Sequence, residues 1–220
     1  MSDGWIELFN GNDLSNWNGQ SDDGSHDWQT AGGVSLKTDD PGHFDIQEGE
    51  GLLVNGQAGV TANLYTDFLH ADCELHIEFV MSKDSNSGVY FMGKYEIQVL
   101  DSWGKPELQF GTCGGVYARW INEQAVGGAP PRVNASKPPG EWQTYDITFQ
   151  APKFNEDGNK LSNATFIEVV WNGEVVHENV EVDGPTRAHM PGDEQPRCPL
   201  MLQGDHGPVA YRNIRMRELE

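Results

Sequence analysis

Short stretches in which apolar and polar residues alternate recur along the chain, and this pattern limits the fold more than any other feature. The clearest example is residues 73–79, where the side chains read Cys, Glu, Leu, His, Ile, Glu and Phe. Successive side chains of a β-strand point to opposite faces of the sheet, so a period of two indicates a strand with one buried face. Residues 208–217 alternate in a similar way, with Val209, Tyr211 and Ile214 set against arginines.

Strand-like segments follow one another at short intervals, with no amphipathic helix of any length between them. We expect strands over residues 5–9, 51–54, 60–65, 72–82, 87–100, 142–150, 165–171, 174–181 and 209–217. Asn172-Gly173 separates two of them and predicts a type I′ hairpin turn. Many short strands joined by turns predict an all-β sandwich of two packed antiparallel sheets, and 220 residues suit a single domain over residues 1–220.

The charge of the chain narrows the range of partners. There are 34 acidic and 14 basic residues, a formal net charge of −20. Such a chain repels phosphates, so we expect neither nucleic acid nor an anionic membrane as a partner. No apolar run approaches the roughly 20 residues of a membrane span, and no signal peptide is visible. We therefore expect a cytoplasmic location if Met1 is the native start, and a periplasmic or secreted one if a signal was removed.

Two segments interrupt the strand pattern. Residues 102–141 contain glycine, proline and aromatic residues without a clear period, and residues 183–199 are rich in proline and charge. Long irregular segments in a compact domain are usually either functional or disordered. The first contains too many aromatic side chains for disorder, so we expect it to form a wall or lid over a cleft.

Residues 95–101 (YEIQVLD) form a predicted strand that contains unusual polar residues. Simple alternation places Glu96 and Gln98 on one face and Asp101 on the other. A β-bulge near Leu100 would bring both carboxylates to the same face.

The strand over residues 72–82 also has a polar face, formed by Glu74, His76 and Glu78. If the two strands share a sheet, their acidic and amide groups gather on one surface. A solvated outer sheet face is one interpretation of this surface. The other is a concave groove that binds a hydroxyl-rich ligand or a hard cation.

Four ordered segments of the chain resemble a known family. They are WIELFNGNDLSNW at 5–17, NSGVYFMGKYEIQVLDSWG at 86–104, NASKPPGEWQTYDITFQAPKF at 134–154 and DHGPVAYRNIRMREL at 205–219. Together they are similar to the 3-keto-disaccharide hydrolase family and span nearly the whole chain. The resemblance implies a concanavalin A-like jelly-roll sandwich with long loops over a concave face, and a small oxidised glycoside or disaccharide as substrate.

The resemblance also implies a reaction. A ketone at C3 of a sugar acidifies the C2–H bond, so a base can form an enolate and the aglycone at C1 can leave by β-elimination. Water can then add to the product and give net hydrolysis. Such an enzyme needs a general base, a group that stabilises the enolate oxygen and a proton donor for the leaving group.

Candidate residues for these roles come from the matching motifs. We expect a reacting set of Glu96, Asp101, Lys137 and His206, with Lys137 over the enolate oxygen. Asp205 could orient the imidazole, and which group acts as the base stays open. Substrate binding is expected from Asn86, Gln98, Trp103, Gln203 and Glu78.

A metal ion is a further candidate component. Glu96, Asp101 and neighbouring carbonyls could hold Ca²⁺ or Mg²⁺, which prefer oxygen ligands, and a cation there would polarise the ketone. The chain has no Asp-rich loop with regular ligand spacing, so this prediction depends on the two carboxylates lying together. The three cysteines form no CxxC pair and indicate neither a zinc site nor a disulfide framework.

Two other functions fit the same fold. Sandwich glucanases of the retaining type carry E-x-D-x-x-E, and this chain has Glu96, Gln98 and Asp101 at the same spacing but with Gln and Asp substituted. A non-catalytic carbohydrate-binding module is the second alternative. In either case Trp103 and Trp120 could serve as platforms for sugar rings.

Overall fold

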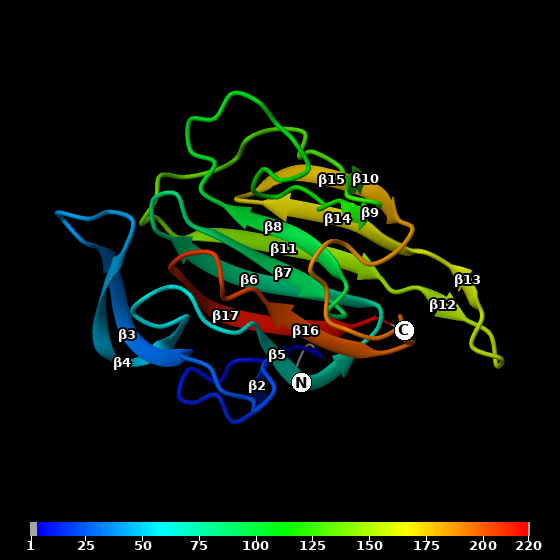
Figure 1. Cartoon of the computed structure of the whole chain (residues 1–220), viewed down its shortest axis with the longest axis horizontal. Helices are drawn as coiled ribbons and strands as arrows, with labels where there is room; N and C mark the ends of the chain where they lie inside the picture. The colour runs from blue at the N-terminus through cyan, green and yellow to red at the C-terminus, as the bar shows by residue number, and fades with distance from the viewer. Residues whose placement is uncertain (1–3, 220) are drawn as a thin grey trace.

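The computed structural model describes residues 4–219, and Met1, on which the expected location depends, lies outside them. These residues form an all-β structure in which two antiparallel sheets pack face to face as a jelly-roll sandwich (Figure 1). The predicted fold class is confirmed. Within residues 4–219 there is no helix, and so none that could cross a membrane.

The larger sheet has eight strands. Its order is β15 (Glu174–Val182), β14 (Ala164–Trp171), β11 (Gln143–Gln150), β6 (Cys73–Met81), β17 (Val209–Glu218), β4 (Phe44–Val54) and β3 (Gln29–Leu36). The short β1 (Ile6–Glu7) also pairs with β17. Strands distant in sequence, such as β6 and β17, are neighbours here.

The smaller sheet has five strands and carries the candidate site. Its order is β2 (Trp17–Gly19), β5 (Leu64–His70), β16 (Cys198–Leu202), β7 (Asn86–Phe91) and β8 (Tyr95–Leu100). Two small hairpins stand apart from both sheets: β9 (Arg119–Ile121) with β10 (Gln124–Val126), and β12 (Lys153–Phe154) with β13 (Lys160–Ser162).

Residues 73–79 form a strand with one buried face, as their alternating pattern predicts. The apolar residues of this stretch are all at most 1% exposed and belong to the core cluster that contains Phe91, Phe149 and Phe166. Burial of this aromatic and aliphatic surface is the main force that holds the sandwich together. The predicted hairpin is also confirmed, because Asn172 and Gly173 join β14 to β15 with φ of 51° and 87°, as a type I′ turn requires.

Glycine and proline residues explain why the sequence pattern did not predict two of the strands. β3 contains a Gly-Gly pair, and β16 begins Cys-Pro, a dipeptide unusual inside a sheet. The structure accommodates Pro199 with a register shift between Pro199 and Met201. β4 extends seven residues further towards the N-terminus than predicted, and β5 covers residues 64–70 instead of 60–65.

Candidate active site

The candidate site lies on the face of the smaller sheet that is turned away from the core. In β8 the side chains of Ile97 and Val99 belong to the core, so those of Glu96 and Gln98 point to the opposite face. Both are nevertheless buried, at 3% and 4% exposure, because the irregular segments cover this face.

The cover is hydrogen-bonded directly to the edge of the sheet. β8 is an edge strand, and the backbone of Gly114, Gly115 and Tyr117 pairs with the backbone of Glu96 and Gln98 at 2.9–3.0 Å. An edge that is paired in this way is closed to further strands and gives the site a fixed wall.

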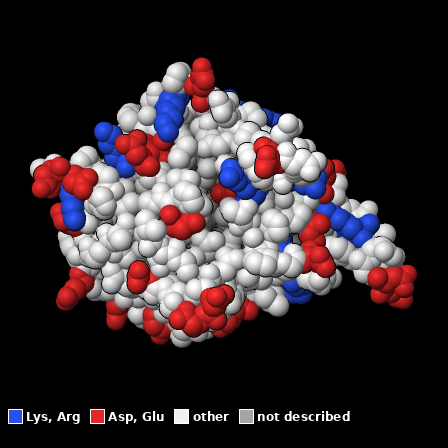
Figure 2. Space-filling model, in the orientation of Figure 1, with Lys and Arg blue, Asp and Glu red and all other residues white. Residues whose placement is uncertain are grey.

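A cavity of about 260 Å³ opens between this cover and the strands. Five residues predicted from the sequence line it: Asn86, Glu96, Gln98, Gln203 and His206. Four more lining residues were not predicted: Tyr90, Tyr117, Arg187 and Ala188. The space-filling view shows a hollow near the centre of this face, with acidic and basic side chains beside it (Figure 2).

Gly88 makes room for the carboxyl group of Glu96. The two residues lie on neighbouring strands, and a Cβ atom at position 88 would stand only 2.3 Å from Oε1 of Glu96. Any side chain at this position would therefore push the carboxyl group out of its place. The glycine of the NSG motif is explained by this close approach.

Burial changes the chemistry of Glu96. Loss of hydration raises the pKa of its carboxyl group from 4.5 to about 8, because the charged form is disfavoured away from water. A hydrogen bond with Tyr90 lowers the pKa in part, and the charge of Asp205 raises it further. At neutral pH Glu96 is thus mostly protonated and able to donate a proton.

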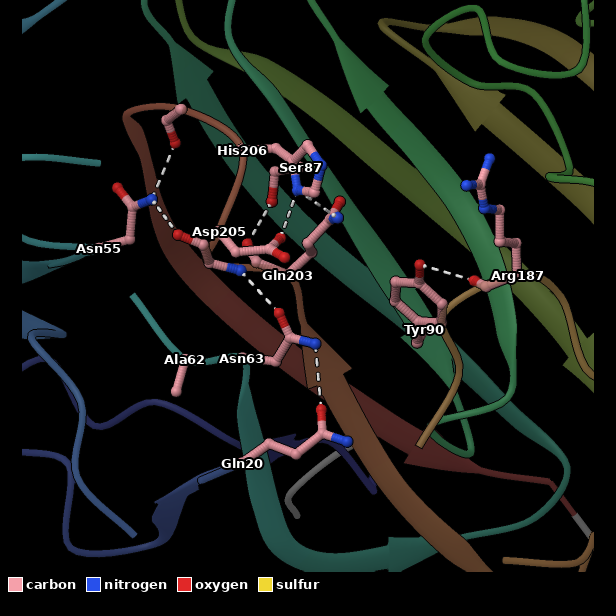
Figure 3. Close-up of polar contacts among 12 residues, drawn as sticks. Gln20, Asn55, Ala62, Asn63, Ser87, Tyr90, Arg187, Gln203, Asp205 and His206 are labelled. Carbon is pink, nitrogen blue, oxygen red and sulfur yellow. Dashed lines mark hydrogen bonds and ion pairs between the residues drawn. The ribbon is translucent and has the colours of Figure 1, made fainter. Parts of the chain in front are cut away.

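His206 also lines the cavity and is oriented by its neighbours. Its Nδ1 lies 2.5 Å from Oδ1 of Asp205 and 3.1 Å from the side-chain amide of Gln203 (Figure 3). A carboxylate at one ring nitrogen fixes the tautomer and leaves the other nitrogen available for a substrate. The backbone carbonyl of His206 also accepts a hydrogen bond from the N–H of Asn86 (3.0 Å).

Two residues that line the cavity carry side-chain amide oxygen atoms without a hydrogen-bond partner among residues 4–219. These atoms are Oδ1 of Asn86 and Oε1 of Gln203, and both are buried. Buried polar atoms normally have partners, so an unpaired one at a cavity suggests that a ligand supplies the bond. Amide oxygens accept hydrogen bonds from hydroxyl groups, and sugars carry many of these.

Four predicted site residues do not line the cavity: Asp101, Lys137, Trp103 and Glu78. Asp101 binds backbone N–H groups of the turns at the end of β8, those of Asp84 (2.9 Å) and Trp103 (3.2 Å). Lys137 donates to the carbonyl of Trp142 (2.9 Å). Trp103 is 55% exposed. The predicted β-bulge is wrong, since β7 and β8 pair without a register shift, and Asp101 therefore does not join Glu96.

Glu78 and its neighbours belong to the other sheet, so the prediction of one shared polar surface is also wrong. β6 lies in the eight-stranded sheet, whereas β8 lies in the five-stranded one. Glu78 accepts hydrogen bonds from Arg212 (2.7 Å) and Asn213 (2.6 Å), and His76 pairs with Asp146 (2.6 Å). These side chains bind one another on the outer face of the larger sheet.

The residues expected to hold a cation do not form a metal site. Asp101 uses both carboxylate oxygens in the turns, and Glu96 is largely neutral. Within residues 4–219 there is no group of three or more His, Cys, Asp or Glu side chains that could hold a metal ion. The donor set therefore does not fit the proposed Ca²⁺ or Mg²⁺.

Arg187 is the most important lining residue that the sequence did not predict. It lies in the irregular segment 183–199, where no period indicates which side chains face inward. Its Cζ atom is 4.1 Å from the centroid of the Trp120 ring, and its carbonyl accepts a hydrogen bond from the hydroxyl of Tyr90 (3.2 Å; Figure 3). A positive charge beside the cavity was expected, but from Lys137.

The chain resembles several solved structures. A protein of Parabacteroides distasonis, provisionally described as a glycosyl hydrolase, is 31% identical, with a TM-score of 0.68 over 99% of this chain and 84% of its own. A second such protein from the same organism is 21% identical, with a TM-score of 0.60 over 98% and 99% of the two chains, which shows the shared fold. No curated protein matches the sequence at a significant level.

Family membership follows from the match over almost the whole chain. Residues 4–217 match the family described as the 3-keto-alpha-glucoside-1,2-lyase-like domain. This range contains both sheets, the cavity and both covering segments. The chain belongs to the 3-keto-alpha-glucoside-1,2-lyase-like family.

Proposed function

We propose that this protein cleaves the glycosidic bond of 3-keto-glycosides by β-elimination. The family and its glycosyl hydrolase relative support an enzyme that acts on sugars. Elimination in particular is supported by two groups that line the same cavity. One is the protonated carboxyl group of Glu96, and the other is the imidazole of His206, which the carboxylate of Asp205 orients. Elimination needs one base and one acid, and these two groups can supply them.

In the proposed reaction His206 is the base. Its imidazole removes the proton from C2 of the sugar, and the electron pair of the C–H bond forms an enolate with the C3 ketone. Asp205, held to Nδ1, stabilises the imidazolium that results. The unpaired oxygens of Asn86 and Gln203 bind sugar hydroxyl groups and place C2 against the base.

Glu96 is the acid in the second half of the reaction. The enolate collapses to a C1–C2 double bond, the bond from C1 to the aglycone oxygen breaks, and that oxygen takes the proton from Glu96. The products are an unsaturated 3-keto sugar and the free aglycone. Water that adds across the new double bond would complete net hydrolysis.

The cavity supports elimination over the two alternatives. A retaining glycosidase needs two carboxylates about 5–5.5 Å apart, and Glu96 is the one carboxyl group among the residues that line this cavity. A binding module would present exposed aromatic rings to a sugar, whereas neither Trp103 nor Trp120 lines the cavity.

The proposal is tested with three parallel incubations in D₂O: a 3-keto-α-glucoside, the unoxidised glucoside, and the keto sugar without protein. We expect aglycone release and deuterium at C2 from the keto sugar alone. Release from the unoxidised glucoside would instead indicate a conventional glycosidase. Binding of either sugar without release or exchange would indicate a binding module.

Variants of the two reacting groups separate their roles. We expect His206→Ala to lower both exchange and release by about 10²-fold or more. Glu96→Gln should lower release by about 10²-fold for an alkyl aglycone and much less for a nitrophenol, which leaves without a proton. Asp101→Asn is the matched control outside the cavity. Equal activity of all three variants with the wild type would contradict the site.

A further inference from the structure

We infer that Arg187 is a catalytic residue that binds the C3 oxygen of the substrate and stabilises the enolate formed there. This inference rests on the proposed function and adds to it the electrophilic group that the reaction needs. The role was expected of Lys137, whose ammonium group is bound to the carbonyl of Trp142 away from the cavity.

The charge of Arg187 has no ion-pair partner among residues 4–219. The chain has far more acidic than basic side chains, and five arginines form ion pairs: Arg119, Arg132, Arg197, Arg212 and Arg217. Among residues 4–219, no carboxylate lies within ion-pair distance of Arg187. The guanidinium group is stacked on Trp120, which occupies its face and leaves its N–H edge free.

Arg187 is the one lysine or arginine among the residues that line the cavity. Glu96 is mostly neutral at pH 7, because burial raises the pKa of its carboxyl group to about 8. The other lining residues are amides, tyrosines, an alanine and His206, whose partner is Asp205. A ligand in the cavity therefore meets the positive charge of Arg187 directly, whereas the carboxylate of Asp205 is bound to Nδ1 of His206 and is not among the lining residues. A neutral keto sugar has no negative charge in its ground state, whereas its enolate does.

Hydrogen bonds hold the backbone of Arg187 beside the reacting groups. The N–H of Arg187 donates to the carbonyl of Ala118 (3.0 Å), and Tyr90 donates to its carbonyl (3.2 Å). The preceding residue, Thr186, accepts a hydrogen bond from the N–H of Glu96 (3.2 Å). A group fixed before the reaction stabilises developing charge without reorganisation at the moment it forms.

The backbone conformation of the residue after Arg187 also supports a functional role for this segment. Ala188 has a φ of 60°, in the left-handed region that residues with a side chain rarely adopt. Such a conformation costs free energy and persists where the surrounding structure requires it, often at functional sites. Here it turns the chain at the cavity, directly after the residue that carries the charge.

Kinetics of Arg187→Gln test the inference. We expect the variant to lower C2–H exchange and aglycone release together by about 10²-fold or more, with a change in KM below about threefold, as when an oxyanion donor is lost. Arg187→Lys, which keeps the charge but loses the planar fork, should retain intermediate activity. Arg215→Gln is the matched control, because Arg215 also stacks on a tryptophan, Trp5, and has no ion pair among residues 4–219.

A spectroscopic measurement gives a second, independent result. A 3-keto-glucoside labelled with ¹³C at C3 is bound to Glu96→Gln, which slows its turnover, and to the double variant with Arg187→Gln. We expect the carbonyl resonance to move downfield in the first protein and to return towards its free position in the second. A structural role for Arg187 would leave this resonance unchanged.

The outcomes separate this inference from the proposed function. If the wild-type protein neither exchanges C2–H nor releases the aglycone, the proposed function is wrong. If the wild type is active and Arg187→Gln retains its exchange rate within about threefold, the role of Arg187 alone is wrong. A raised KM with unchanged kcat also overturns it, because the arginine would then bind the ground state of the substrate.

Discussion

The position of Glu96 under the covering segments affects the stability of the protein as well as its chemistry. Its carboxyl group has a pKa of about 8 in the folded protein and about 4.5 when exposed. Between these two values the folded state binds more protons than the unfolded state. The free energy of unfolding therefore decreases as pH rises from about 4.5 to about 8. Above pH 8 the contribution of Glu96 to the free energy of unfolding no longer changes with pH.

Glu96→Gln should remove this pH dependence, because the amide does not titrate. We expect the loss of stability between pH 4.5 and pH 8 to be smaller in the variant by an amount on the order of 5 kcal/mol. Urea unfolding of both proteins at the two pH values measures it. The other acidic residues titrate in the same way in both proteins. If the free energy of unfolding changed by the same amount between the two pH values in both proteins, Glu96 would not be buried as described.

Gly88→Ala tests the close approach to the same carboxyl group. The new methyl group would meet the flexible end of Glu96, which can move, so we expect the sheet to remain intact and the carboxyl group to be displaced. Activity should fall by about tenfold or more through loss of positioning. Turnover and thermal unfolding are measured together. Gly42→Ala, whose nearest contacts would be ordinary at 3.4 Å or more, is the control that should change neither.

At the scale of single residues, the sequence predicted half of the site. Alternation along one strand placed Glu96 and Gln98 on the same face, and they do share it. The same alternation placed Asp101 on the opposite side, and only an assumed bulge brought it back. Glu78 has the same spacing pattern but lies in the other sheet. Periodicity tells which side chains of a strand share a face, but not which strands are neighbours.

At the scale of elements, the segment 183–199 is held in place by a buried lysine. Nζ of Lys94, in the turn between β7 and β8, donates hydrogen bonds to the carbonyls of Met190 (2.5 Å), Pro191 (3.2 Å) and Gly192 (2.8 Å). Three carbonyls around one ammonium group fix a segment that has no regular structure of its own. The same segment carries Arg187, three residues before Met190.

Lys94→Met should therefore loosen the segment without unfolding the sandwich. Methionine fills the volume but leaves the three carbonyls without a donor, so we expect a loss of about 2–3 kcal/mol in the free energy of unfolding. Activity should fall as Arg187 loses its position. Urea unfolding and turnover measure the two effects. The control is Lys153→Met, which removes an exposed lysine paired with Asp72 (2.6 Å). An equal loss of stability and turnover in the control would contradict the assignment.

At the scale of the whole molecule, the net charge of −20 acts against the compact state. Acidic side chains are spread around the visible surface with fewer basic ones between them (Figure 2). Repulsion among like charges destabilises a folded protein, and salt screens it over about 10 Å at 0.1 M. We expect the Tm at pH 7.5 to rise between 10 mM and 500 mM NaCl. A falling Tm would show that the surface ion pairs outweigh the repulsion.

The sequence by itself determined the all-β class, the hairpin at Asn172-Gly173 and the buried face of β6, because each depends on residues close together in the chain. The tertiary structure alone decided that β6 and β8 lie in different sheets and that Arg187 reaches the cavity. These facts depend on strand order and on hydrogen bonds between distant segments, such as that from Arg187 to Ala118. Such contacts follow from how the two sheets and their covering segments pack, and local periodicity does not encode them.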